Sequence, residues 1–122
     1  MKKLTQAEEQ IMHALWALES GGFLKDIIEH LPEPRTHHNT VATLLKILVE
    51  KEFVGIQNPN RNNFYTALVS KEKYSEQRIA GLTESFFEGS YQNVVSFLVQ
   101  KKQMSIKELE LLLKQLKNKT NE

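Results

Sequence analysis

The organisation of this chain is set by the residues Arg35-Thr36-His37-His38-Asn39-Thr40-Val41-Ala42-Thr43-Leu44-Leu45-Lys46-Ile47-Leu48-Val49-Glu50-Lys51. Apolar side chains recur here at the i, i+3, i+4, i+7 spacing of one helical stripe: Val41, Leu44, Leu45 and Leu48. The opposite side is short and polar, with no acid before Glu50, whereas a solvated helix usually carries long Glu and Lys pairs. The stretch therefore predicts a helix with one face in the core and the other against a partner. A polar face that contacts only water is the alternative.

Two amphipathic segments precede this helix. Thr5-Gln6-Ala7-Glu8 has the pattern of a capping box, so a first helix is expected to follow it and to end at Ser20-Gly21-Gly22. Residues 23–31 predict a shorter second helix, which the Pro32-Glu33-Pro34 motif stops. Because the third helix follows this connector directly, the second and third helices are expected to form a helix-turn-helix.

A β-hairpin is predicted after the third helix. Residues 53–57 and 64–69 are runs rich in β-branched and aromatic side chains, and the polar loop Asn58-Pro59-Asn60-Arg61-Asn62-Asn63 separates them. Three helices followed by a hairpin are typical of a winged helix. Arg61 is the only base at the hairpin tip. The loop alone favours neither of two interpretations, in which Arg61 contacts a phosphate or faces solvent.

The last part of the chain predicts helices over about 71–88, over 91–100 and after the capping box Ser105-Ile106-Lys107-Glu108. About 50 helical residues bury too little apolar area to be stable alone. We therefore expect a homodimer in which two copies interlock, and folding of these helices back onto the same chain is the alternative. The residues expected to form the dimer are Phe86, Phe87, Val94, Val95, Phe97, Leu98, Leu109, Leu112 and Leu113.

The predicted fold is mainly α with a small β-hairpin. It comprises a winged helix-turn-helix domain over residues 1–70 and a helical dimerisation domain over residues 71–122.

The composition narrows the possible functions. The absence of cysteine excludes a disulfide framework, a thiolate zinc site and a cysteine nucleophile. No apolar run approaches the roughly 20 residues that span a bilayer, and the start lacks a signal-peptide pattern, so a cytoplasmic protein is expected. Glycine-rich phosphate loops and nucleophile elbows are also absent, and the adjacent His37 and His38 point about 100° apart on a helix. We predict that the chain is no enzyme and has no cofactor, metal site or small-molecule ligand.

Charge alone does not indicate a nucleic-acid binder. The net charge is +1, and residues 1–70 carry seven bases against eight acids. DNA binding would have to depend on a few locally placed bases and on two copies of the domain. A winged helix whose polar face docks a partner protein is the alternative function.

Several motifs recur in one known family. They are Leu4-Thr5-Gln6-Ala7-Glu8 with Ile11-Met12 and Leu15-Trp16, residues 40–45 with Leu48 and Lys51, Arg61 and Tyr65, residues 86–90 with 94–98, and residues 105–109. Together they cover nearly the whole chain and resemble the penicillinase-repressor (BlaI/MecI/CopY) family of bacterial transcription factors. The resemblance implies a winged-helix homodimer that binds a palindromic double-stranded DNA operator and represses β-lactam-resistance or copper-homeostasis genes.

The resemblance also implies roles for single residues. Asn39, Thr40 and Thr43 are expected in the major groove, with Arg61 on the phosphate backbone beside it. His38 and Lys46, near the same polar side, complete the expected DNA-binding set. In the β-lactam branch of the family a membrane-bound metalloprotease sensor leads to cleavage in the dimerisation helices. Such a sensor is therefore an expected upstream partner.

This chain departs from the family pattern around the third helix. Ile47 stands where the family usually has Arg, Glu52 where it has Gly, and Thr36 where a Trp opens the helix. A phosphate contact is therefore expected to be missing at position 47. The operator sequence of other family members cannot be assigned to this chain. The cysteine-rich tail of the copper branch is absent, which favours the β-lactam branch or an unassigned branch.

Overall fold

The computed structural model describes residues 2–120, and the side chains of residues 2–118. Met1 and residues 121–122, at the outer ends of the two predicted domains, lie outside the described residues. The chain divides into two compact units, and the division falls between Ser75 and Glu76. Over residues 2–120, every helix is too short or too polar to cross a membrane.

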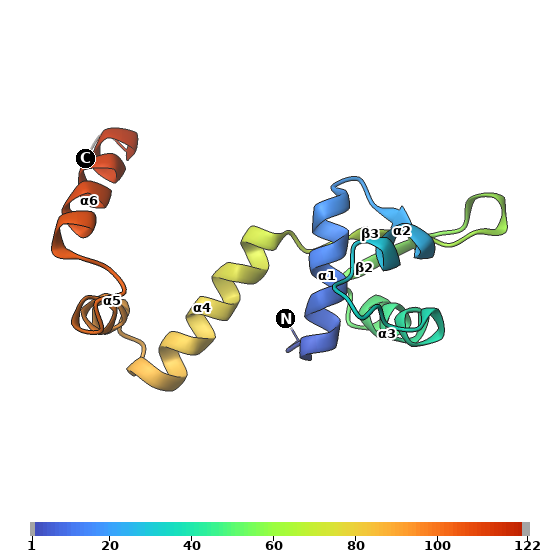
Figure 1. Ribbon diagram of the computed structural model, residues 1–122, viewed down its shortest axis with the longest axis horizontal. Helices are drawn as coiled ribbons and strands as arrows, with labels where there is room; N and C mark the ends of the chain where they lie inside the picture. Colours follow the sequence, from blue (N-terminus) through green and yellow to red (C-terminus); the bar gives the residue numbers. More distant parts are fainter. Residues whose placement is uncertain (1, 121–122) are drawn as a thin grey trace. The chain divides into compact units, whose positions relative to one another are not determined.

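The first unit combines helices with a small sheet (Figure 1). Its helices are α1 (Gln6–Leu18), α2 (Leu24–Glu29) and α3 (His38–Glu50). Its antiparallel sheet, in the order β1-β3-β2, contains β1 (Gly22–Phe23), β2 (Val54–Gln57) and β3 (Phe64–Ala67). Residues 58–63 join β2 to β3 through the short 3-10 helix η1 (Pro59–Arg61), and we call this loop the wing. The predicted mainly α fold with a small hairpin, ordered as a winged helix, is confirmed.

Helix α1 starts where the sequence predicts. The Glu8 amide donates to the Thr5 hydroxyl at 3.2 Å, and the Thr5 amide donates to Glu8 Oε1 at 2.8 Å, so the capping box is present. The helix ends at Leu18, and Gly21 follows with a φ of +98°. A Cβ at Gly21 would lie 2.5 Å from the Tyr65 carbonyl oxygen, which explains why this position requires glycine.

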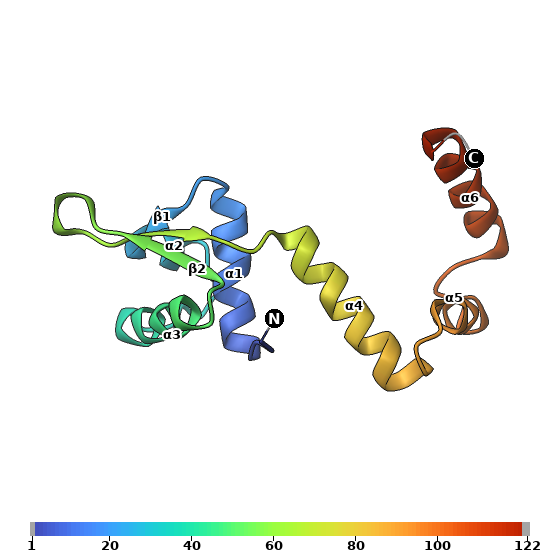
Figure 2. The same ribbon diagram turned by 180° about the vertical axis from the view of Figure 1, so that it is seen from behind.

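Strand β1 corrects the sequence prediction. Residues 22 and 23 were assigned to the end of the first helix and the start of the second, but they pair with Tyr65 and Phe64 of β3. The Phe23 and Phe64 rings meet edge to face, with centroids 5.0 Å apart. Helix α2 therefore begins at Leu24, beside the base of the wing (Figure 2).

Helix α3 begins later than predicted. Arg35, Thr36 and His37 lie in the connector between α2 and α3, and the helix starts at His38. The predicted apolar stripe is confirmed, because Val41, Leu45 and Leu48 are fully buried and Leu44 is partly buried against them.

The core of the first unit lies between α1, α2, α3 and the sheet. Its most deeply buried apolar residues are Ile11, Met12, Leu15, Ile27, Val41, Leu45, Leu48, Phe53 and Val54. Full burial of an aliphatic or aromatic side chain of this size contributes about 1.5–3 kcal/mol. Trp16 packs on the edge of this core, and its indole Nε1 donates to the Val69 carbonyl at 2.9 Å.

The second unit is helical. It contains α5 (Tyr91–Gln100), α6 (Ile106–Thr120) and most of α4 (Lys71–Phe87), with boundaries close to those expected. The predicted capping box of α6 is present, because Glu108 N donates to Ser105 Oγ and Ser105 N donates to Glu108 Oε1. The first turn of α4 belongs to the first unit, where Tyr74 packs against the rings of Trp16 and Phe53.

Candidate nucleic-acid interface

Helix α3 presents one exposed polar face. Its exposed residues from His38 to Lys46, which we call the polar face, are His38, Asn39, Thr40, Thr43 and Lys46, and Glu50 is exposed in the last turn. The opposite side of the helix is anchored by three side chains with 0% exposure: Val41, Leu45 and Leu48. The helix is therefore fixed from behind, while its polar side chains are free to meet a partner.

The polar face offers a mixed set of hydrogen-bonding groups. The Thr43 hydroxyl donates to the Asn39 carbonyl at 3.0 Å, so its oxygen remains available only as an acceptor. The Asn39 side-chain amide has both a donor and an acceptor, the combination that matches the edge of adenine in a DNA major groove. The Thr40 hydroxyl can donate or accept. These groups suit base edges better than they suit an apolar protein surface.

The start of α3 is capped by a histidine. His37 Nδ1 accepts a hydrogen bond from the Asn39 amide at 3.1 Å, which requires that nitrogen to be unprotonated. The ring of His38 stacks on that of His37, with centroids 4.5 Å apart and planes inclined by 25°. Within the described residues, His, Asp and Glu side chains form no group of three that could hold a metal ion.

The wing is braced at its base. Asn58 Nδ2 donates to Asn63 Oδ1 at 2.9 Å, and Asn63 Nδ2 reaches the hydroxyl of the buried Tyr65 at 3.4 Å. At the tip, Asn60 and Arg61 adopt φ values of 52° and 66°. Arg61 is exposed and makes no ion pair with any described residue. These hydrogen bonds therefore attach the base of the loop that carries Arg61 to strand β3.

Three acids of the first unit are engaged in contacts with other residues of that unit. Glu8 pairs with Lys51, Glu9 accepts from the Tyr74 hydroxyl, and Asp26 Oδ2 accepts from the Phe23 amide at 3.0 Å. On α3 itself, Glu50 lies eleven residues beyond Asn39, roughly 16 Å along the helix axis. Residues 38–46 therefore carry Lys46 and no acid, and the wing carries Arg61 and no acid, although the first unit as a whole is nearly neutral.

One buried ion pair fixes the end of α3 against the start of α1. Lys51, the C-cap of α3, contacts Glu8 Oε1 at 2.8 Å and Oε2 at 3.1 Å, and Glu8 is only 2% exposed. Burial is the largest single influence on the pKa of Glu8 and raises it. Hydrogen bonds from Lys51 and Thr5, together with the charge of Lys51, outweigh burial and hold the pKa of Glu8 below its ordinary value. Glu8 is therefore a carboxylate at neutral pH.

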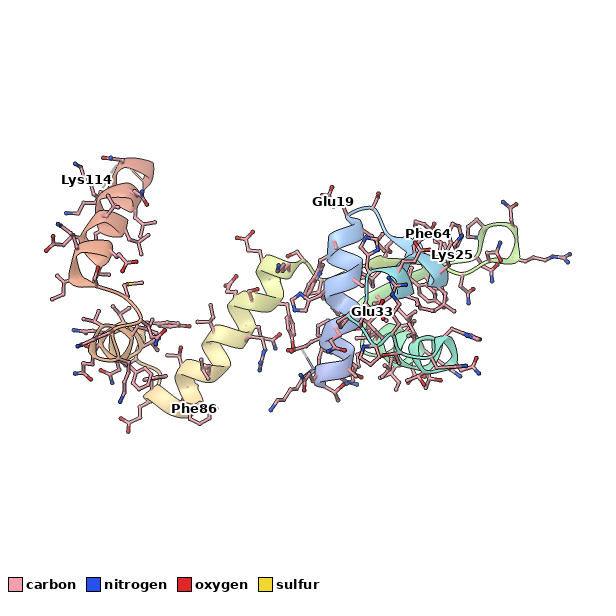
Figure 3. The ribbon with its side chains drawn as sticks, viewed as in Figure 1. Glu19, Lys25, Glu33, Phe64, Phe86 and Lys114 are labelled. Atoms are coloured by element: carbon pink, nitrogen blue, oxygen red, sulfur yellow. The ribbon has the colours of Figure 1, made fainter. Side chains whose placement is uncertain are left out.

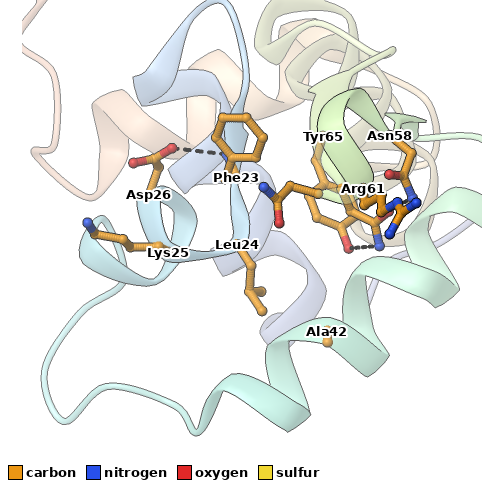
Figure 4. A pocket seen from close by; sticks show the side chains of 10 residues that line it. Phe23, Leu24, Lys25, Asp26, Ala42, Asn58, Arg61 and Tyr65 are labelled. Atoms are coloured by element: carbon orange, nitrogen blue, oxygen red, sulfur yellow. Dashed lines mark hydrogen bonds between the residues drawn. The ribbon is translucent and has the colours of Figure 1, made fainter.

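A groove lies beside the polar face, between α2, α3 and the wing (Figure 4). Its volume is about 630 Å³, and its lining includes Lys25, Ala42, Asn58, Arg61 and Tyr65. Lys25 is absent from the predicted DNA-binding set. Nothing in its local sequence marks it, because the pairing of β1 with β3 is what brings the start of α2 to the wing.

Two of the three family departures, Ile47 and Glu52, have clear structural settings. Ile47 is half-buried, so this side of α3 supplies no cation at position 47. Glu52 adopts a φ of 66°, a conformation in which glycine has no steric penalty. The Phe53 amide donates to the Leu48 carbonyl across this residue at 2.9 Å. The helix end therefore has a glycine-type shape although it carries Glu.

The residues predicted to form a dimer lie on α4, α5 and α6. Phe86, labelled in Figure 3, is 73% exposed, and Phe97, Leu112 and Leu113 are each more than 40% exposed. Phe87, Val94, Leu98 and Leu109 are half-buried, and Val95 is 36% exposed. The Phe87 and Phe97 rings meet edge to face at 5.5 Å, which connects α4 to α5.

The penicillinase repressor family model matches residues 4–118. The chain belongs to the penicillinase repressor family. This family consists of transcriptional repressors and not of enzymes, so the chain is a DNA-binding regulator of transcription. A solved structure titled "CopR Repressor Structure" is 28% identical, with a TM-score of 0.46, and the match covers 57% of this chain and all of that one. No curated protein sequence matches the chain.

Proposed function

We propose that this penicillinase repressor family member acts as a homodimer on a palindromic operator. In each copy, α3 enters the major groove, where Asn39, Thr40 and Thr43 read base edges. Arg61 of the wing holds the flanking phosphate backbone, and His38 and Lys46 contribute at the two ends of the polar face. Bidentate or well-formed base contacts of this kind are each worth about 1–3 kcal/mol of discrimination.

The observation that carries this proposal is the construction of α3. A helix with fully buried apolar residues on one side and an exposed, acid-free polar side over its first turns is rigid enough to set a register on DNA. The local charge supports the same partner. The cations Lys46 and Arg61 are free of ion pairs with described residues, while several acids are occupied elsewhere.

The second unit supports the dimer. Of its described residues, only Thr83 is fully buried, whereas large apolar side chains are exposed along all of its helices. Such a unit does not bury enough apolar area to be stable as a monomer. We propose that a second copy covers these faces, so that two modest half-site contacts become one linked binding event.

The regulated genes are proposed to be of β-lactam-resistance type, with release of the operator by proteolysis downstream of a membrane-bound metalloprotease sensor. Ser96 and Phe97 lie in the middle of α5 and are exposed. Cleavage there would cut a helix that carries dimer-forming residues. Loss of the dimer would then lower operator affinity without any change to α3.

A winged helix that docks a protein is the second candidate, favoured only by the near-neutral net charge. Salt dependence separates the two. The full chain is titrated onto a duplex taken from the DNA upstream of its own gene, at several salt concentrations. We expect a linear fall of log affinity with log salt concentration and two chains per duplex. An affinity that does not change with salt would contradict DNA binding.

A further inference from the structure

We infer that the groove between α2 and the wing holds one phosphodiester strand of the operator. We infer also that Lys25 contacts a phosphate of this strand from the α2 side of the groove, opposite Arg61. This inference rests on the proposed function and adds a second anchor to it. The groove is lined by Phe23, Leu24, Lys25, Asp26, Ala42, Asn58, Arg61, Asn62, Asn63 and Tyr65.

The chemistry of the lining matches a phosphodiester backbone. Two cations, Lys25 from α2 and Arg61 from the wing, stand on opposite sides of the groove (Figure 4). The side-chain amides of Asn58, Asn62 and Asn63 also line it and can donate hydrogen bonds to phosphate oxygens. Phe23, Leu24 and Tyr65 form apolar walls that suit the sugars between phosphates.

The charge balance of the groove permits an anion. Asp26 is the single acid among the lining residues, and its carboxylate is turned to the Phe23 amide at 3.0 Å. Lys25 and Arg61 make no ion pair with a described residue, so neither cation has to give up a partner when a phosphate arrives. The formal charge of the lining is therefore +1, from two bases and one acid.

The position of the groove selects DNA over a free small anion. Ala42 of α3 lines it, and Ala42 directly precedes Thr43 of the polar face. A strand that borders the major groove occupied by α3 would therefore continue into this space. The pairing of Gly22–Phe23 with Phe64–Tyr65 fixes the distance between the two walls, and the Asn58–Asn63–Tyr65 brace stiffens the wing side.

The inference predicts a change in salt dependence when Lys25 is neutralised. Each phosphate contact contributes about 0.9 to the slope of log affinity against log salt, so Lys25→Gln should lower the slope of a dimer by about 1.8. If the affinity at 1 M salt is unchanged, a slope lower by about 0.9 for each protomer reduces the DNA affinity at 0.1 M salt by about 8-fold for each protomer.

The experiment compares variants of the full chain on the duplex from upstream of its gene and on a scrambled duplex. Lys25→Arg keeps the charge and should keep the slope. Lys73→Gln is the matched control, because Lys73 is exposed in the first turn of α4 and does not line the groove. Lys25→Gln should weaken both duplexes alike, since phosphates carry no sequence information.

The possible outcomes separate the two claims. If the unaltered chain binds duplex DNA but Lys25→Gln has the same slope as Lys73→Gln, the groove inference is wrong and the proposed function stands. If the unaltered chain shows no salt-dependent binding to any duplex, both are wrong. A slope lowered by Lys25→Gln, and restored by Lys25→Arg, supports the strand in the groove.

Discussion

Replacing Lys51 with Met should expose how much the first unit depends on its buried ion pair. The change removes the ammonium group but keeps an unbranched apolar stem, so Glu8, 2% exposed, keeps Thr5 as its hydrogen-bond partner but loses its cation. Removing one member of a buried pair costs about 3–5 kcal/mol. Because the Lys51 side chain is 21% exposed, water reaches part of the site and we expect a smaller loss, about 2–3 kcal/mol at pH 7. For a unit of this size that lowers Tm by roughly 10–20 °C.

The pH dependence of this loss follows from the pKa of Glu8. In the unaltered chain that pKa is depressed on folding, so its stabilising contribution is present at neutral pH and is lost as the pH falls below about 4.5, through the folded value. In Lys51→Met, burial remains but its main opposing influences are gone, so the pKa of Glu8 rises above its ordinary value. Protonation of Glu8 at low pH then removes its buried negative charge and the destabilisation that this charge causes. The difference in stability between the two proteins should therefore shrink from pH 7 to pH 4.

Urea unfolding measures both effects. Trp16 is the only tryptophan and lies in the first unit, so its fluorescence reports this unit alone. Lys73→Met, at an exposed position, is the control and should change stability by less than about 0.5 kcal/mol. The reasoning would be refuted if Lys51→Met were as stable as Lys73→Met at pH 7, or if its deficit were the same at pH 4.

Three further predictions concern backbone shape and assembly. Gly21→Ala should lower the free energy of unfolding of the first unit by about 2–4 kcal/mol, because the new Cβ would lie 2.5 Å from the Tyr65 carbonyl; urea unfolding checks this, with an unchanged midpoint as the contrary result. Glu52→Gly should instead stabilise this unit by about 0.5–1 kcal/mol, since glycine adopts the φ of 66° at no steric cost, and the same titration would show a loss if the Glu52 side chain were needed. Phe86→Glu should shift the chain from dimers to monomers in sedimentation equilibrium while the Trp16 unfolding transition of the first unit persists; dimers of undiminished affinity would place Phe86 outside the interface.

Features with a local cause could be predicted from the sequence. The stripe of α3 follows from the spacing of Val41, Leu45 and Leu48, and the two capping boxes follow from residues three positions apart. The polar loop over residues 58–63, between two runs rich in β-branched and aromatic residues, likewise predicted the wing. In each case the residues that determine the feature are close together in the sequence, so the pattern of residue types is enough to predict the feature.

Features that depend on distant pairing could not be predicted. Strand β1 has two residues, too few for an alternating pattern, and its partner is β3 at the other end of the first unit. The placement of Lys25 beside the wing depends on that pairing, so it was missed as well. The Glu8–Lys51 pair joins residues 43 positions apart, and the sequence indicated Glu8 only as part of a cap. The start of α3 was misplaced because the cap is the ring nitrogen of His37, a less common capping group than Ser, Thr, Asp or Asn.

The central claim, that the polar face of α3 reads DNA sequence, is tested most directly by a specificity ratio. The affinity of the full chain for the duplex from upstream of its gene is divided by its affinity for a scrambled duplex, for the unaltered chain and for Thr40→Ala with Thr43→Ala. Gln10→Ala, exposed on α1, is the control. We predict that the double variant lowers the ratio by at least about fivefold, the equivalent of 1 kcal/mol of lost base contact, while Gln10→Ala leaves it unchanged. A double variant with the ratio of the unaltered chain would contradict the assignment of α3 as the reading helix.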